Sequence, residues 1–160
     1  MKNKNIFKVL FFLVVVISIL VFVRWNSELN RNNRYLAGKL LNGVSDTSGT
    51  AGELFDFDYD KLYVFEPYQS KDEMEKQIGF KSRVLQETVS ENMINILFVK
   101  DDSPVAYLYG YGSNNVYYIE LPIGNYSKSE LQETRYRVIT NKVGNSSGTE
   151  KTYLNYIFEF

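Results

Sequence analysis

The 160-residue chain contains no cysteine and no histidine, and it has only three prolines and one tryptophan. Without cysteine it can form no disulfide, thiol nucleophile, or Cys-ligated zinc or iron–sulfur site. Without histidine it lacks Ser-His-Asp and Cys-His triads, His-ligated zinc or haem, and any imidazole acid–base step. Chemistry is therefore left to carboxylates, lysine, tyrosine, serine and threonine, and we expect no metal site and no cofactor.

Charge is divided unevenly along the chain. Residues 1–52 carry seven basic residues against Glu28 and Asp46, a net +5, whereas residues 53–160 carry eleven basic and seventeen acidic residues, a net −6. An acidic body repels a phosphate backbone, so we expect no nucleic-acid partner. The 11 Phe and 13 Tyr exclude intrinsic disorder for most of the chain.

The clearest long-range feature is an apolar run near the N-terminus. Residues Val9–Val23 are apolar except for Ser18, and extension to Ile6 adds only one charge, Lys8. Eighteen helical residues span about 27 Å, close to the ~30 Å of a bilayer core. This pattern predicts a transmembrane anchor within residues 1–25 that contacts the lipid bilayer through residues 6–25.

Two other interpretations of this run remain open. A cleaved signal peptide fits the basic start, but no small-x-small pair follows Val23, and a lipoprotein route needs a cysteine that the chain lacks. A buried helix of a soluble protein is the third possibility. Positive charges on the two sides nearly balance, but a basic start before an apolar run is typical of export. We therefore expect a single-pass protein of the cell membrane with its C-terminal domain outside.

Residues 26–52 are predicted to connect this anchor to the domain. Trp25, Leu29, Leu36 and Leu40 fall on one stripe of a helix, with Gly43 as a stop. The helix is either a juxtamembrane helix that leans on lipid headgroups or a plain stalk. Residues 44–52 are small and polar and predict a linker, which leaves residues 53–160 as an extracytoplasmic α+β domain.

Local patterns predict the elements of the domain. Aromatic and Asp residues alternate over 54–60, which is typical of a strand, and 61–65 predicts a more buried strand. Ser70 and Glu73 form a capping box that predicts a helix over 71–78, ended by Gly79. Residues 82–92 fit either a short helix or a strand.

The second half alternates β-branched and aromatic runs with turn residues. Strands are predicted at 94–100, 105–111, 116–123, about 133–142 and 151–159, and residues 112–115 form a turn between two of them. The expected fold class is α+β, with one antiparallel sheet of about five or six strands and one short helix packed on it.

Two residue groups are candidate binding sites, at low specificity. Asp56, Asp58 and Asp60 would line one strand face, as a weak cation or basic-partner site or as a solvated face; they fail the EF-hand pattern at the glycine and final glutamate positions. Tyr107, Tyr109 and Tyr111 share one strand face, with Tyr117 and Tyr118 on the neighbouring strand. Tyrosine suits sugar or protein surfaces, but ordinary packing explains the same pattern.

The stretches Asp58–Phe80 and Ile94–Tyr111 resemble small uncharacterised exported or membrane-anchored proteins of low-GC Gram-positive bacteria. The shared pattern is Asp-Lys before an apolar strand, then Phe-x-Pro-Tyr, a capped short helix and a hairpin with Gly-Tyr. The resemblance implies an extracytoplasmic α+β domain and no activity. The chain departs from lipid-anchored members because it has no cysteine to acylate.

Together these patterns favour a membrane-anchored, non-catalytic binding or accessory domain outside the membrane, with a protein or glycan of the envelope as partner. The alternative is an immunity or inhibitor protein at the cell envelope, because an acidic face such as Asp56, Asp58 and Asp60 suits a basic effector. A carboxylate-dependent hydrolase is the third hypothesis, although no spacing singles out a pair of acids.

Overall fold

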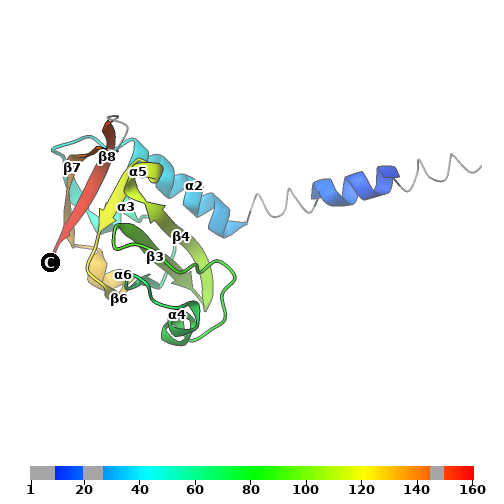
Figure 1. Ribbon diagram of the computed structural model, residues 1–160. Coiled ribbons are helices and arrows are strands. Elements are labelled where there is room, and N and C mark those ends of the chain that lie inside the picture. Colours follow the sequence, from blue (N-terminus) through cyan, green and yellow to red (C-terminus); the bar gives the residue numbers. More distant parts are fainter. Residues whose placement is uncertain (1–9, 20–26, 145–149) are drawn as a thin grey trace, which may run out of the picture.

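The computed structural model describes residues 10–19, 27–144 and 150–160, and its body is built from two four-stranded sheets (Figure 1). Sheet A has the order β1 (Ser48–Thr50), β7 (Arg135–Gly144), β8 (Glu150–Glu159) and β5 (Tyr117–Glu120). Sheet B has the order β4 (Ser103–Tyr111), β3 (Met93–Lys100), β2 (Lys61–Val64) and β6 (Gly124–Ser127). Neighbouring strands run antiparallel except β5 and β8, which are parallel.

The predicted α+β class is confirmed, but the prediction of one antiparallel sheet is wrong. After β4 the chain does not turn back into sheet B at residues 112–115. It forms the short helix α5 (Gly112–Asn115), and Val116 then adopts a φ of 67°, a value that β-branched residues rarely take. This turn carries β5 across to sheet A, where it pairs with β8.

Helix α4 (Lys71–Ile78) has the bounds that the capping box predicts. The Ser70 side chain accepts from the Glu73 N–H, the Glu73 carboxylate accepts from the Ser70 N–H, and Gly79 ends the helix at a φ of 87°. An eight-residue helix is too short to be stable alone, so it packs through Met74 and Ile78 on the outer face of sheet B.

The same capping pattern starts two helices that the sequence analysis missed. In α3 (Ala51–Leu54) the pair is Thr50 and Glu53, and in α6 (Lys128–Leu131) it is Ser127 and Glu130. The strand predicted at 54–60 is wrong, because this segment ends α3 and continues without regular structure. Residues 82–92, left open between helix and strand, form neither.

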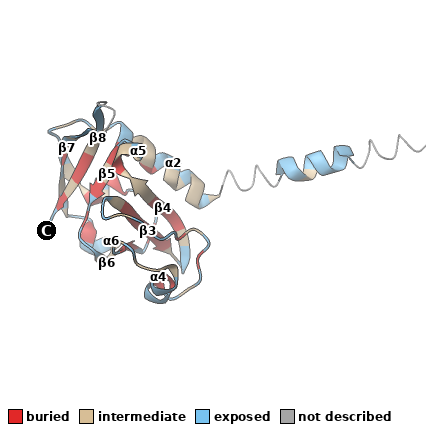
Figure 2. Cartoon of the chain, in the orientation of Figure 1, coloured by how far each residue is buried: buried red, intermediate tan, exposed pale blue. Residues whose placement is uncertain are grey.

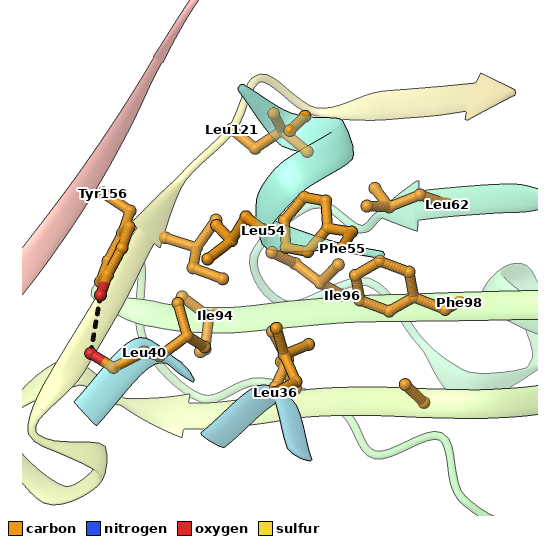
Figure 3. Close-up of a cluster of buried hydrophobic side chains, with 14 of the residues drawn as sticks. Leu36, Leu40, Leu54, Phe55, Leu62, Ile94, Ile96, Phe98, Leu121 and Tyr156 are labelled. Carbon is orange, nitrogen blue, oxygen red and sulfur yellow. Dashed lines mark hydrogen bonds between the residues drawn. The ribbon is translucent and has the colours of Figure 1, made fainter. Parts of the chain in front are cut away.

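A hydrophobic core fills the space between the two sheets (Figure 3). Sheet B contributes Leu62, Ile96 and Phe98, and sheet A contributes Val138, Tyr156 and Phe158. The Phe55 ring packs edge-on against Phe98 and stacks on Phe158, at centroid distances of 5.1 and 5.6 Å. Phe55 therefore bridges the two sheets although it lies outside both.

A second cluster covers the outer face of sheet B. Tyr63, Phe65, Leu97 and Val99 point away from the main core and pack against α4 and residues that follow it, such as Leu85. Strand β3 is consequently buried on both faces, and it lies between β4 and β2. The prediction that residues 94–100 form a central strand is confirmed.

Helix α2 (Glu28–Leu41) is part of the packed body. Leu36 and Leu40 are fully buried in the main core, and the buried Tyr156 hydroxyl donates to the Leu40 carbonyl over 2.8 Å (Figures 2 and 3). The helix predicted in this region is present, and half of its predicted stripe closes the core. The segment predicted as a linker contains β1, which pairs with β7.

The predicted anchor lies partly outside the described residues. Its described part, residues 10–19, forms a helix with mostly exposed side chains (Figure 2). Of the helices that the structure describes, none combines the length and apolarity that crossing a membrane requires.

Substitution of Leu40 by Ala should lower the free energy of unfolding by about 2–5 kcal/mol, because it leaves a cavity where the side chain is completely enclosed. Leu41→Ala is the matched control: Leu41 is 49% exposed, so its effect should stay within about 0.5 kcal/mol. Urea denaturation of the full chain in detergent, followed by circular dichroism, measures both. Equal effects would contradict the placement of α2 in the core.

Candidate binding surface

The first candidate group, the three aspartates, does not form one site. Asp56 is held by α2: its carboxylate accepts from Lys39 at 2.9 Å and from the Tyr35 hydroxyl at 2.8 Å. Burial alone would raise the pKa of Asp56, but the hydrogen bonds from Lys39 and Tyr35 together hold this pKa below its usual range. Asp56 therefore anchors α2 to the segment that follows α3.

Asp58 and Asp60 have different partners again. Asp58 pairs with Lys100 at the end of β3, and the Asp60 carboxylate accepts from the Asp101 N–H over 3.0 Å. The alternation noted in the sequence does separate the two sides of this segment, since Tyr59 is buried and these two aspartates are exposed. Within the described residues no cluster of three acids could hold a metal ion.

The tyrosines of β4 hold the outer layer of sheet B in place. The Tyr107 and Tyr109 rings stack at 5.9 Å, and the Tyr109 hydroxyl donates to the Glu87 carbonyl. The Tyr107 hydroxyl donates to the Asn95 side chain and accepts from the Gln86 N–H. Burial raises the pKa of the Tyr107 hydroxyl, so this hydroxyl stays a neutral structural donor.

Tyr117 does not lie beside these tyrosines. The sequence predicts Tyr117 and Tyr118 on a strand next to β4, but β5 belongs to sheet A. Tyr117 is buried in the main core, and Tyr111 lies half-buried at the end of β4. The predicted aromatic surface is therefore divided between two sheets.

A hollow of about 520 Å³ lies beside the end of α4. Its one deeply buried acid is Glu75, which is 7% exposed; the carboxylate accepts from Lys81 at 2.6 Å and from the Ser82 N–H at 2.9 Å. These hydrogen bonds, first that of Lys81, lower the pKa of Glu75. Lys81 also reaches Asp72 at 3.4 Å, so both acids of this hollow are paired with the same lysine.

The outer face of sheet A is different from the other three sheet faces. The inner faces of both sheets form the main core, and α4 with residues 79–92 covers the outer face of sheet B. Neither buried cluster includes the outward-facing residues of β7 and β8. Helix α5 covers only one end of this face, where Gly112 packs against Tyr118 and Tyr153.

At the centre of this face lies Asn155. Its neighbours across the strands are Ile139 on β7 and Tyr118 on β5, and Tyr153 and Ile157 flank it along β8. We call these five residues the Asn155 patch. The four surrounding side chains are half-buried, and the Tyr118 and Tyr153 rings lie 6.4 Å apart.

The Asn155 amide is incompletely satisfied. Asn155 is only 5% exposed; its Nδ2 donates to the Glu120 carboxylate over 3.0 Å, whereas its Oδ1 is buried without a partner in the described structure. Asn95 is its counterpart on sheet B, where Oδ1 accepts from Tyr107 and Nδ2 donates to the Gln86 carbonyl. A covering layer satisfies Asn95, whereas the half-buried side chains around Asn155 enclose its Oδ1 without supplying a donor.

The Asn155 patch was not identified from the sequence. In residues 153–158 of β8 both alternating sets are largely apolar, so a period of two does not tell which set faces the core. The available signal was a single Asn inside an aromatic and aliphatic strand, because buried amides are usually paired. This signal indicates a special position without indicating its role.

Replacing Glu75 with Gln should destabilise the fold at pH 7, because the pKa of Glu75 is lowered in the folded state. A lowered carboxylate pKa adds stability above the unfolded pKa, about 4.3 for glutamate, and this stability is lost as the pH falls below it. The difference from the parent chain should therefore shrink between pH 7 and pH 3. Glu133→Gln, at an exposed acid, is the control in the same denaturation series.

Asn155→Val should raise the free energy of unfolding by about 1 kcal/mol, because it removes a buried acceptor without a partner and adds a β-branched residue to a strand. The exposed Glu120 regains water as its partner. Asn95→Val, by contrast, should destabilise, because it removes the acceptor at 2.9 Å from the Tyr107 hydroxyl and the amide donor to the Gln86 carbonyl. If both variants were destabilised equally in urea, the contrast between the two amides would be refuted.

Comparisons of the chain with protein-family models, curated proteins and solved structures find no match. The resemblance of Asp58–Phe80 and Ile94–Tyr111 to small exported proteins stays a prediction. Function is therefore inferred from the described side chains.

Proposed function

We propose that the protein is a membrane-anchored, non-catalytic binding or accessory protein, and that the Asn155 patch receives a protein partner outside the membrane. The observation that carries this proposal is the buried Asn155 Oδ1, which has no partner among the described residues. An unpaired buried acceptor costs about 1–3 kcal/mol. A partner that covers the face, shifts the side chains that enclose this oxygen and donates to it would remove this cost.

The composition of the patch supports a protein as the partner. Protein interfaces are enriched in aromatic residues at the core and depleted of charge there. The Asn155 patch has two Tyr and two Ile around one amide. Charged residues lie at its rim, where Arg137 pairs with Glu159 at 3.0 Å. Tyrosine adds contact area with little loss of side-chain freedom.

The described N-terminal helix supports the membrane anchor. Phe11, Phe12 and Ile17 are 65%, 67% and 57% exposed, and such an apolar surface is unfavourable in water. The length of the apolar run favours lipid as the environment that covers these side chains. Helix α2 begins on the side of the body opposite β7 and β8 (Figure 1). A domain attached there would present the Asn155 patch away from the bilayer.

The immunity or inhibitor alternative receives less support from the described residues. It was based on a free acidic face, but Asp56 and Asp58 each pair with a lysine of the same chain. Little negative charge remains there for a basic effector. A neutral, tyrosine-rich surface favours an accessory role instead.

A photo-crosslinking residue placed at Ile139 or Tyr153 of the full chain in intact cells should give a discrete crosslinked species. The same residue at exposed Leu41 on α2 is the control and should give none. Protease added outside the cells should digest the C-terminal domain. Labelling at Leu41 equal to that at the patch, or a domain protected from external protease, would overturn the proposal.

A further inference from the structure

The free edge of β5 offers unpaired backbone groups. The Leu154 N–H donates to the Val116 carbonyl over 3.1 Å. In the parallel pair of β5 and β8, this bond determines which residues of β5 direct their backbone groups toward β8. In such a pair, alternate residues direct their N–H and C=O groups to the partner strand. Tyr118 and Glu120 therefore bond β8, whereas Tyr117 and Ile119 direct their backbone groups to the opposite edge. No strand among the described residues pairs there.

The corresponding edge of sheet B is blocked. There α2 lies along β4: the Asn32 side chain donates to the Val105 carbonyl over 2.9 Å, and the Asn33 side chain accepts from the Tyr107 N–H over 2.7 Å. These two side chains occupy the positions that an added strand would need. Exposed edges are usually protected in this way. No described side chain is hydrogen-bonded to the β5 edge, but Tyr117 and Ile119 are only 8% and 3% exposed, so an added segment must displace the side chains packed against this edge.

A cavity of about 140 Å³, with apolar and polar walls, lies directly beside the β5 edge, between this strand and the ends of β2 and β3. Its apolar walls include Val64, Ile94, Ile96, Leu121 and Ile123. An engineered protein cavity of about 150 Å³ holds a benzene molecule. The cavity beside β5 can therefore accept one large apolar side chain.

The charge at this cavity has one sign. Glu91 and Glu120 line it, and no Lys or Arg does. Both acids are exposed, and Glu120 uses one carboxylate oxygen for Asn155. An approaching segment with a positive side chain would be complementary to this site.

We propose that the free edge of β5 binds an extended segment of a partner protein by strand addition. One apolar side chain of the segment enters the cavity, and a Lys or Arg lies beside Glu91 and Glu120. Backbone pairing supplies affinity in such complexes, and the pockets for alternate side chains supply specificity. This inference rests on the binding function proposed above and names the chemistry of the partner.

The test uses the full chain in detergent and a phage-displayed library of random dodecapeptides. Selected peptides should share one apolar anchor with a basic residue near it. The best peptide is then synthesised with single backbone N-methyl groups at successive positions. Strand addition requires alternate N–H groups, so affinity should fall about tenfold or more at every second position. Uniform tolerance of N-methylation, or no enriched peptide, would overturn the inference.

Two further measurements locate the peptide on β5. Amide exchange of Tyr117 and Ile119 should slow on binding, whereas the amides of Tyr118 and Glu120 are already bonded to β8. Glu91→Lys and Glu120→Lys should each weaken binding about fivefold to tenfold, and Glu133→Lys, an equal charge change elsewhere, should leave it unchanged. Equal weakening by all three variants would contradict the site.

Failure here and failure of the proposed function can be distinguished. If crosslinks form at Ile139 and Tyr153 in cells but no peptide protects Tyr117 and Ile119, strand addition is wrong and the patch remains. If the peptide binds β5 but the domain is protected from external protease, the proposed location is wrong and strand addition remains.

Discussion

The buried hydrogen bond between the Tyr156 hydroxyl and the Leu40 carbonyl joins α2 to the last strand, 116 residues later in the chain. Sheet A depends on this contact between α2 and β8, because its strands come from residues 48 to 159 and β8 pairs with both β7 and β5. Leu36 and Leu40 fill the space beside Tyr156 in the main core. The two sheets therefore share one core, which is complete only when α2 and β8 are both packed against it.

A sandwich of two sheets has four faces, and the described chain covers three of them well. Two faces form the main core, and the third is covered by α4 and residues 79–92, which the Tyr107, Tyr109 and Asn95 side chains hold in place. Asn95 and Asn155 occupy equivalent outer faces, so their hydrogen bonds can be compared. The covering layer completes the hydrogen bonds of Asn95, whereas Asn155 Oδ1 is enclosed by its neighbours and has no partner among the described residues.

The sequence predicted elements whose cause is local. Ser70, Glu73 and Gly79 specify α4 within ten residues, and the apolar run of β3 on both faces correctly indicated a central strand. It did not predict how strands divide between two sheets. That division depends on the unusual φ of Val116 after α5, and a β-branched residue gives no signal for such a turn. The run at 54–60 shows a related limit, since alternating burial occurs there without strand pairing.

The candidate site was less predictable than the fold. Which side of β8 faces the core is decided by α2 and sheet B, both distant in the chain, so Tyr153, Asn155 and Ile157 looked equivalent to Leu154, Tyr156 and Phe158. Of the residues that did stand out, the aspartates, Tyr107 and Tyr109 are structural contacts, and Tyr118 alone belongs to the Asn155 patch. Clusters of one residue type are visible in a sequence, whereas an unpaired amide is visible only when its surroundings are known.

Glu120 links the open face of sheet A to its free edge. Its carboxylate accepts from Asn155 Nδ2 at the centre of the patch, and the same side chain lines the cavity beside β5. Because Asn155 uses one oxygen of the Glu120 carboxylate, the other oxygen can accept from a cation that enters the cavity. Glu120 therefore belongs to both surfaces, which are suited to one partner that contacts both.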